Sequence, residues 1–244
     1  PPNTWRADNS QKDEDPMFVM PGQGRHVRPK PGPHKWGANG FGKMKNPIKE
    51  PQASHIYFVV RDDSAKTDIV FQTADTVWQA YNPEGGASTY LSFAPHVKHR
   101  CYKASYDRPL RTREIRPANA FLGSEFPMIQ FLEKHGYSVS YISGVDTDRL
   151  GYERLLQHKL FLSVGHDEYW SGRQRANLEA AQEKGGLHIA FLAGNEMFWR
   201  IRWEDDYRTM VVFKETQHTY GVKLDPNETE WTGTWRDARS ENPI

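Results

Sequence analysis

Short apolar runs alternate with amphipathic stretches through the middle of the chain. Four of these runs have the length of a buried β-strand, and they lie at Asp68–Thr73, Tyr137–Ile142, Leu160–Val164 and His188–Leu192. The stretches between them carry apolar residues at helical spacing. Strands that are apolar throughout and that alternate with helices are typical of a parallel sheet. The pattern therefore predicts an α/β domain whose mostly parallel sheet has helices on both faces.

The predicted helices have recognisable ends. Ser124 is expected to cap a helix that stops at Gly136, because serine accepts hydrogen bonds from free helix N–H groups and glycine adopts the left-handed backbone of a helix end. Asp146 or Thr147 is expected to cap a short helix in the same way. Ser171 is expected to cap a longer helix, which ends at a pair of glycines.

Weaker β patterns lie outside the four central runs. Further strands are predicted at His55–Val60, Tyr102–Tyr106, Arg208–Phe213 and Gln217–Leu224. The stretch Trp231–Asp237 is predicted to be a loop.

Residues 1–54 differ from the rest of the chain. Residues 1–50 hold 8 of the 16 prolines, and six glycines lie between Gly22 and Gly42. This composition predicts a Pro/Gly-rich loop or linker, or the end of an N-terminal domain that precedes the given chain. Residues 55–244 then form the α/β domain. Because the chain starts without methionine and stops without a helix cap or a tail, we expect a piece of a longer polypeptide, truncated at the C-terminus.

Charge and hydropathy exclude several classes of protein. The 244 residues carry 32 Lys+Arg and 31 Asp+Glu, and a net charge of +1 provides no basic surface for nucleic acid. No run approaches the ~18 apolar residues that a membrane-spanning helix needs, so a soluble, cytoplasmic protein is expected. Cys101 is the single cysteine, which excludes an intrachain disulfide and a cysteine metal cluster. Aromatic residues make up 13%, which indicates a dense core or an aromatic-lined pocket.

Candidate chemistry follows the predicted strands, because ligands of open α/β sheets bind beyond the carboxyl ends of the strands. After Leu160–Val164 come His166, Asp167 and Glu168. In an extended backbone His166 and Glu168 point to the same side, where they are placed to act as general base or metal ligand. The alternative is that one of the two acids caps the next helix and that His166 packs beneath it.

Other strand ends also carry polar groups. Asn195 follows His188–Leu192 at a glycine–asparagine turn, where its amide either binds a ligand or closes the turn. Glu196 is expected to begin a helix and to face solvent. Tyr81 and Tyr90 flank a Pro-Glu-Gly-Gly turn. They are either packing residues or, as phenolates, oxygen donors that suit Fe(III).

Several motifs of this chain occur together, and in the same order, in a known family. They are Thr76-x-Trp78-Gln79-Ala80-Tyr81-Asn82, Gly85-Gly86-x-Ser88-x-Tyr90, Ser105-Tyr106-Asp107-Arg108-Pro109, Gly165-His166-Asp167-Glu168-Tyr169-Trp170-Ser171 and Gly194-Asn195. Over roughly residues 55–237 the chain resembles the large (β) subunit of N,N-dimethylformamidase and the wider family of its C-terminal domain. With the strand pattern, the resemblance implies a fold of the glutamine-amidotransferase or flavodoxin-like kind.

The resemblance also implies an activity, which is amide hydrolysis at a mononuclear iron(III) held by two tyrosines and a glutamate. Carried over to this sequence, the implied metal ligands are Tyr81, Tyr90 and Glu168, with Tyr106 as the second choice for the second tyrosine. His166 is implied beside Glu168 as a proton carrier, and Asn195 as a contact of the substrate or of the residues around the metal.

The implied substrate is a small amide, hydrolysed with the metal as Lewis acid. Aromatic walls are expected around it from Trp78, Tyr169, Trp170, Phe198 and Trp199. The implied partners are a small subunit or further copies of the chain, and neither nucleic acid nor a membrane is expected. Two alternatives need no metal. One is a non-catalytic amidotransferase-like domain that binds carbohydrate or a protein partner, and the other is a structural module of a multidomain protein.

Overall fold

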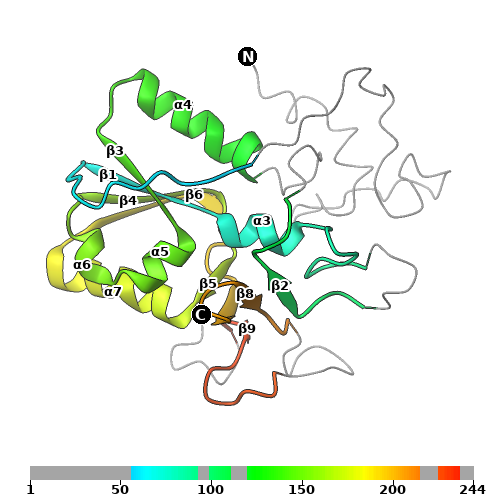
Figure 1. The fold of residues 1–244 in the computed structure, drawn as a ribbon. Coiled ribbons are helices and arrows are strands. Elements are labelled where there is room, and N and C mark those ends of the chain that lie inside the picture. The colour runs from blue at the N-terminus through cyan, green and yellow to red at the C-terminus, as the bar shows by residue number, and fades with distance from the viewer. Residues whose placement is uncertain (1–55, 93–98, 111–119, 215–224, 237–244) are drawn as a thin grey trace, which may run out of the picture. The chain divides into compact units, whose positions relative to one another are not determined.

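The computed structural model describes residues 56–92, 99–110, 120–214 and 225–236 (Figure 1). The Pro/Gly-rich segment 1–54 and the predicted strand at residues 217–224 lie outside the described residues, and both stay predictions. Among the described residues, no helix is long and apolar enough to cross a membrane.

The main sheet has four parallel strands, one for each central apolar run. These are β1 (Ile69–Thr73), β3 (Val139–Ser143), β4 (Leu160–His166) and β6 (His188–Gly194). Their order across the sheet is β3-β1-β4-β6. The chain thus moves from β1 outward to β3 and then returns past β1 to β4. The carboxyl ends of β1 and β4 therefore form a topological switch point, which is where ligands bind in open α/β sheets.

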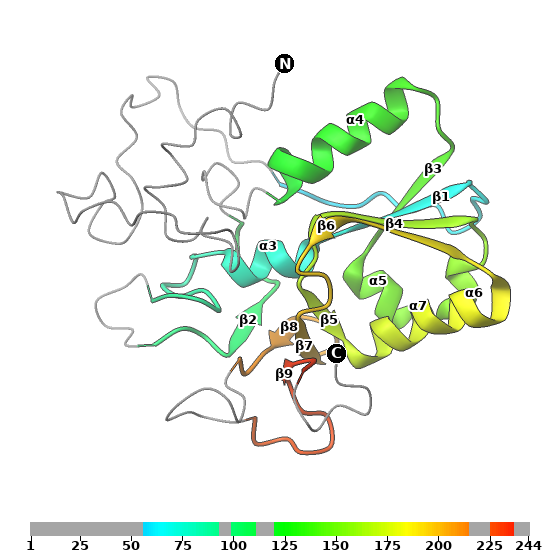
Figure 2. The ribbon, with the colours of Figure 1, turned by 180° about the vertical axis from the view of Figure 1, so that it is seen from behind.

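Helices cover both faces of this sheet (Figures 1 and 2). Helix α4 (Phe126–Lys134) lies on one face, and α5 (Gly144–Arg149), α6 (Tyr152–Leu155) and α7 (Gly172–Gly185) lie on the other. Alternate strand residues pack against the two layers: Phe71 of β1 joins the cluster of α4, whereas its neighbour Val70 joins the cluster of α6 and α7. Both faces are buried, which explains why the strands are apolar at successive positions.

A second sheet, which has five strands among the described residues, lies beyond the carboxyl edge of the first. Its strands are β2 (Lys103–Ser105), β5 (Tyr169–Ser171), β7 (Trp199–Glu204), β8 (Thr209–Val211) and β9 (Gly233–Thr234). The order is β2-β8-β7-β5, and β9 also pairs with β7. The predicted strands at residues 102–106 and 208–213 are confirmed as β2 and β8. The predicted loop at residues 231–237 contains the short β9, and β7 was not predicted.

The segment at residues 56–60 is not a strand, which corrects the prediction for His55–Val60. Its alternate side chains Ile56, Phe58 and Val60 are 86%, 78% and 77% exposed. Within the described residues no strand pairs with this segment. An apolar alternation predicts a strand only where a neighbouring strand supplies the backbone partners.

Two of the predicted helix starts lie elsewhere. A π-helix, η2 (Ala120–Glu125), precedes α4, so Ser124 is already inside helical backbone and does not cap α4. Helix α5 is capped by Ser143, and Asp146 completes the capping box instead of being the cap.

Other predicted helix ends are confirmed. Ser171 caps α7 in a capping box with Gln174. Gly136 has a φ of 71° beyond α4, and the backbone N–H of Tyr137 bonds the carbonyl of Leu132. This bond closes the helix in the way that is usual where a glycine follows the last helical turn.

Candidate functional site

The candidate site lies at the switch point between β1 and β4. A buried helix, α3 (Asp75–Tyr81), follows β1 and ends at Tyr81. A short connection from β4 to β5 carries Asp167 and Glu168. Because both elements start from carboxyl ends of neighbouring strands, residues that are far apart in the sequence meet at one edge of the sheet.

Three oxygen atoms converge at this edge. The hydroxyl of Tyr81 lies 2.8 Å from Oε2 of Glu168, and the hydroxyl of Tyr90 lies 2.9 Å from the same atom. The two hydroxyls lie 2.9 Å from each other. The tyrosine rings stack with their centroids 4.3 Å apart. The structure therefore brings together the residues that the resemblance implied as metal ligands.

The oxygen cluster has one more contact of hydrogen-bond length than it has protons to fill them. Each neutral phenol carries a single O–H, and an ionised carboxylate carries none. Two protons can make two hydrogen bonds, whereas the three oxygens form three contacts of hydrogen-bond length. If both hydroxyls donate to Glu168, the Tyr81–Tyr90 contact joins two lone pairs. A proton-poor cluster of oxygen atoms is a favourable place for a cation.

Burial controls the protonation of these groups. Burial, followed by the charge of Glu168, raises the pKa of Tyr81 and that of Tyr90 well above the ordinary value of a phenol. Burial also acts to raise the pKa of Glu168, but the hydrogen bond and charge of His166, followed by Lys214, outweigh it and lower the pKa. Without a cation the site therefore consists of one carboxylate and two neutral phenols.

His166 and Asn195 lie beside the carboxylate. Nε2 of His166 is 3.3 Å from Oε1 of Glu168 and 3.3 Å from Nδ2 of Asn195. Asn195 adopts a left-handed backbone with a φ of 55°, which asparagine tolerates better than most residues. The structure thus places both residues next to the oxygen cluster. His166 contacts Oε1 of Glu168, whereas both tyrosine hydroxyls contact Oε2.

Neither acid after β4 caps the next helix, because Ser171 does so. Asp167 points away from the oxygen cluster, and its Oδ2 accepts hydrogen bonds of 2.8 Å from Gln72 and from Ser163. Glu168 points into the cluster.

Tyr106 does not join the oxygen cluster. Its hydroxyl donates to Oδ2 of Asp75 at 3.0 Å, at the start of α3. Among the described residues, Tyr90 and not Tyr106 is thus the tyrosine that reaches Tyr81 and Glu168.

The prediction for Glu196 is wrong. No helix begins there, because the chain turns through residues 195–198 and enters β7 at Trp199. Both carboxylate oxygens of Glu196 are buried and have no hydrogen-bond partner among the described residues. Burial, with Asp167 nearby, raises the pKa of Glu196 to about 9. The turn folds inward because the backbone N–H of Met197 bonds the carbonyl of Asp167 at 3.0 Å.

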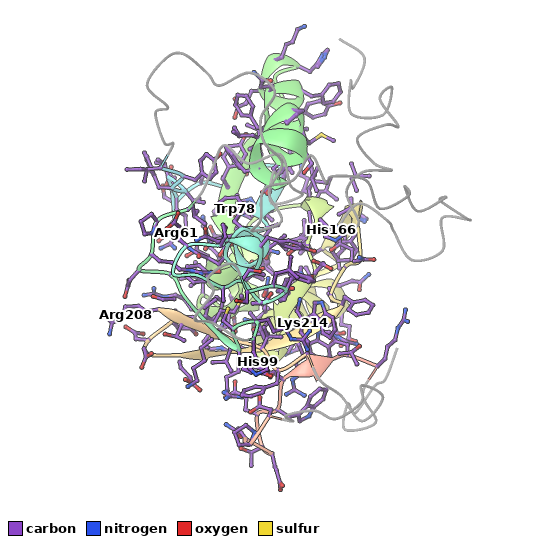
Figure 3. The ribbon with its side chains drawn as sticks, turned by 90° about the vertical axis from the view of Figure 1, so that its right-hand side faces the viewer. Arg61, Trp78, His99, His166, Arg208 and Lys214 are labelled. Carbon is purple, nitrogen blue, oxygen red and sulfur yellow. The ribbon has the colours of Figure 1, made fainter. Side chains whose placement is uncertain are left out.

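Lys214 belongs to the site although the sequence did not point to it. It is 4% exposed, and its Nζ lies 2.9 Å from the centroid of the Tyr90 ring (Figure 3). The rings of Tyr169 and Trp199 lie 4.9 Å and 5.0 Å from the same atom. Nζ has no hydrogen-bond acceptor within the part of the chain that the structure describes, and burial lowers the pKa of Lys214 well below its ordinary value. No local motif marks this lysine.

The aromatic walls are only partly where they were expected. Tyr169 and Trp199 lie in the same hydrophobic cluster as Tyr81 and Tyr90, and so does Trp78. Trp170 lies in another cluster, against Phe161 of the sheet. It points away from the site because successive residues of β5 face opposite sides.

The described residues contain no group of three or more His, Cys, Asp or Glu side chains that could hold a metal ion. Phenol oxygens lie outside that donor class, so the Tyr81, Tyr90 and Glu168 cluster is a separate case.

Comparison with known proteins decides the family. The sequence model described as N,N-dimethylformamidase beta subunit-like, C-terminal, matches residues 38–244. The chain belongs to this family. The match begins within the segment predicted as a linker, and it covers every described helix and strand. No curated protein matches the chain.

Proposed function

We propose that the chain hydrolyses a small amide of the N,N-dimethylformamide type at a mononuclear Fe(III) site. The ligands are Tyr81, Tyr90 and Glu168. The observation that carries the proposal is the convergence of three oxygens within 2.8–2.9 Å of one another, with two protons among them. The family match supports the same activity, because the description of the family names N,N-dimethylformamidase.

The donor set suits a trivalent iron ion. Two phenolates and a carboxylate are hard, anionic oxygen ligands, and their summed charge balances that of Fe(III). The raised pKa of Tyr81 and of Tyr90 means that the phenols keep their protons until a cation displaces them. When bound, the ion supplies Lewis-acid polarisation of the amide carbonyl and acidifies a water molecule.

The protein's own groups handle the proton. An amide nitrogen leaves poorly until it is protonated, so the reaction needs a proton donor near that nitrogen. His166 lies beside the cluster, with Nε2 3.3 Å from Oε1 of Glu168, and its side chain is 19% exposed. While Nε2 is unprotonated, Nδ2 of Asn195 donates to it across 3.3 Å and orients the imidazole. His166 then takes up at Nε2 the proton of the attacking water and delivers it to the departing amine.

The surroundings favour a small alkylated amide. Tyr169 and Trp199 supply apolar surface beside the oxygen cluster, and Tyr169 is fixed by Thr89, whose Oγ1 lies 3.2 Å from its hydroxyl. Apolar walls with a few polar groups bind a substrate that has alkyl groups around one carbonyl.

The test uses the full chain and two independent readouts. Iron is measured by elemental analysis and by the visible charge-transfer band of tyrosinate–Fe(III), and amine release is measured with N,N-dimethylformamide as substrate. We expect one iron per chain, a coloured protein and amine release that stops when iron is removed. Protein that takes up no iron and stays colourless contradicts the proposal and favours a binding domain without metal.

A further inference from the structure

The motif Ser105-Tyr106-Asp107-Arg108-Pro109 supports the family resemblance, yet none of its side chains enters the oxygen cluster. Arg108 is half-buried next to α3 and to the loop that joins Tyr81 to Tyr90. Among the described residues, all but one of the hydrogen bonds of Arg108 go to backbone carbonyls. A guanidinium used in this way fixes chain segments.

The carbonyls bound by Arg108 come from three segments. Nη2 donates to the carbonyl of Gln79 in α3 at 2.5 Å. Nη1 donates to the carbonyls of Glu84 and Ala87 in the loop, at 2.7 Å and 3.3 Å. Nε donates to the carbonyl of Ser105 at 3.1 Å and to the side chain of Gln79 at 3.2 Å.

The neighbours of Arg108 hold the two ends of the same helix. The hydroxyl of Tyr106 donates to Asp75 at the start of α3. Nδ2 of Asn82, the C-cap residue of α3, donates to the carbonyl of Pro109 at 2.8 Å. The motif as a whole therefore forms hydrogen bonds with both ends of α3 and with the loop that follows it.

The loop between Tyr81 and Tyr90 contains a glycine pair, and it is also tied to α3 where the N–H of Thr89 bonds the carbonyl of Ala80 at 2.9 Å. Gly85 and Gly86 both have a positive φ, of 85° and 91°, and glycine pairs leave a loop with many accessible conformations. Tyr90 lies beyond this turn, whereas Tyr81 is the last residue of α3. The separation of the two hydroxyls therefore depends on how the loop between the tyrosines is held.

We propose that Arg108 is a positioning residue that sets the separation of the Tyr81 and Tyr90 hydroxyls by binding α3 and the loop between them. This inference rests on the proposed function for its metal readout, but not for its structural readout. Arginine is required because its planar group offers five donors in a fixed geometry, whereas the ammonium of lysine is a single point.

The experiment compares Arg108→Lys with a matched control, Arg202→Lys. Arg202 is buried, whereas Arg108 is half-buried, and it too holds a loop, through bonds to Asp225 at 2.5 Å and to the carbonyl of Glu230 at 2.9 Å. A glutamate-specific protease reports on each loop separately, since it cleaves after Glu84 in one and after Glu228 or Glu230 in the other. Fe(III) affinity is measured on the same proteins by titration of the visible band.

Each variant is expected to loosen a different loop, and only the Arg108 variant is expected to weaken Fe(III) binding. Arg108→Lys should be cleaved after Glu84 about tenfold faster and bind Fe(III) about tenfold more weakly, the size of effect that partners of metal ligands have. Arg202→Lys should be cleaved faster after Glu228 or Glu230 and keep the Fe(III) affinity of the unaltered chain. Should Arg108→Lys not fold, Arg108→Gln, which keeps part of the reach and one donor group, is tested in the same way.

Each other outcome has a defined meaning. Unchanged cleavage after Glu84 overturns the inference, and so does unchanged Fe(III) affinity in a variant with a loosened loop. Equally faster cleavage of both loops in the Arg108 variants also overturns it, because the arginine then stabilises the whole domain. If the unaltered chain binds no iron, the proposed function fails, while the cleavage arm still decides whether Arg108 holds the loop.

Discussion

The hydroxyl oxygens of Tyr81 and Tyr90 lie 2.9 Å apart, and the two aromatic rings stack. Both hydroxyls also reach one oxygen of Glu168, which is 87 residues from Tyr81 along the chain. Under the proposed function, a cation replaces the protons of these two phenols. The proposed metal ligands can be tested one by one.

Tyr81→Phe and Tyr90→Phe are each expected to weaken Fe(III) binding by at least about 100-fold and to abolish the visible band, because each removes an anionic ligand. Tyr106→Phe is the control, since its hydroxyl bonds Asp75 outside the cluster, and it should keep the iron and the colour. Elemental analysis and absorbance after dialysis give the measurement. Loss of iron in Tyr106→Phe, with retention in Tyr90→Phe, would show that the ligand assignment is wrong.

His166→Gln is expected to lower the rate of amide hydrolysis by about 10²–10⁴-fold while iron stays bound, because a proton donor is lost and no ligand is. Rates of amine release are compared with iron content in the same preparation. A variant that loses rate and iron in parallel would assign His166 to metal binding instead of proton transfer.

Lys214→Met is expected to increase the free energy of unfolding by about 1–3 kcal/mol, since a buried ammonium without an acceptor among the described residues is costly. The same change should lower amide hydrolysis about tenfold, because a cation over the Tyr90 ring favours anionic oxygens at the site. Lys103→Met, at an exposed ion pair with Glu204, is the control, and it should change stability by no more than ~1 kcal/mol. Chemical denaturation and activity assays decide. A less stable Lys214→Met protein would mean that the ammonium is satisfied.

Gly165→Ala is expected to lower the free energy of unfolding by about 2–4 kcal/mol. Gly165 has a φ of 92°, and an added Cβ would overlap Oγ of Ser124. Gly186→Ala isolates the backbone cost, because Gly186 has a φ of 69° and open space around it, and it should cost about 1 kcal/mol. Adding Ser124→Gly to Gly165→Ala should recover the difference. Equal costs for Gly165→Ala and Gly186→Ala would disprove the close approach.

Asp75 gives a pH dependence of stability. Burial, against bonds from Gly144 and Tyr106, raises the pKa of Asp75 from 3.8 to about 6. The folded state then binds a proton more tightly than the unfolded state, so this contribution is present below about pH 4 and is lost as the pH rises through 6. The stability of the unaltered chain relative to Asp75→Asn should fall by up to about 3 kcal/mol between these pH values. Urea denaturation across this range measures it, and a constant difference would contradict the expected shift.

The strands of the main sheet and the helices between them could be predicted from the sequence. The four central apolar runs became β1, β3, β4 and β6 at nearly the predicted positions, because the strands of a sheet covered by helices on both faces are largely apolar at successive positions. The prediction of a strand at residues 55–60 was wrong, because the apolar side chains of Ile56, Phe58 and Val60 are exposed. Ser124 misled as well, because a π-helix continues the helical backbone past an ordinary cap residue.

The site was readable only in part. The motifs around Tyr81, Tyr90 and Glu168 pointed to their chemistry through the family resemblance. The choice between Tyr90 and Tyr106 was open, since each belongs to a motif that carries the family resemblance. Lys214 and the loop-holding role of Arg108 left no local signal, because each depends on neighbours that come from several segments.

The sequence by itself determined the α/β class, the succession of the parallel strands and the family, because apolar periodicity and short motifs are properties of neighbouring residues. Only the tertiary structure decided the strand order β3-β1-β4-β6 and the meeting of Tyr81 and Tyr90 with Glu168. The physical reason is that hydrogen-bond contacts between residues 78 and 87 positions apart are set by how the strands pack side by side. Local pattern carries no information about that packing.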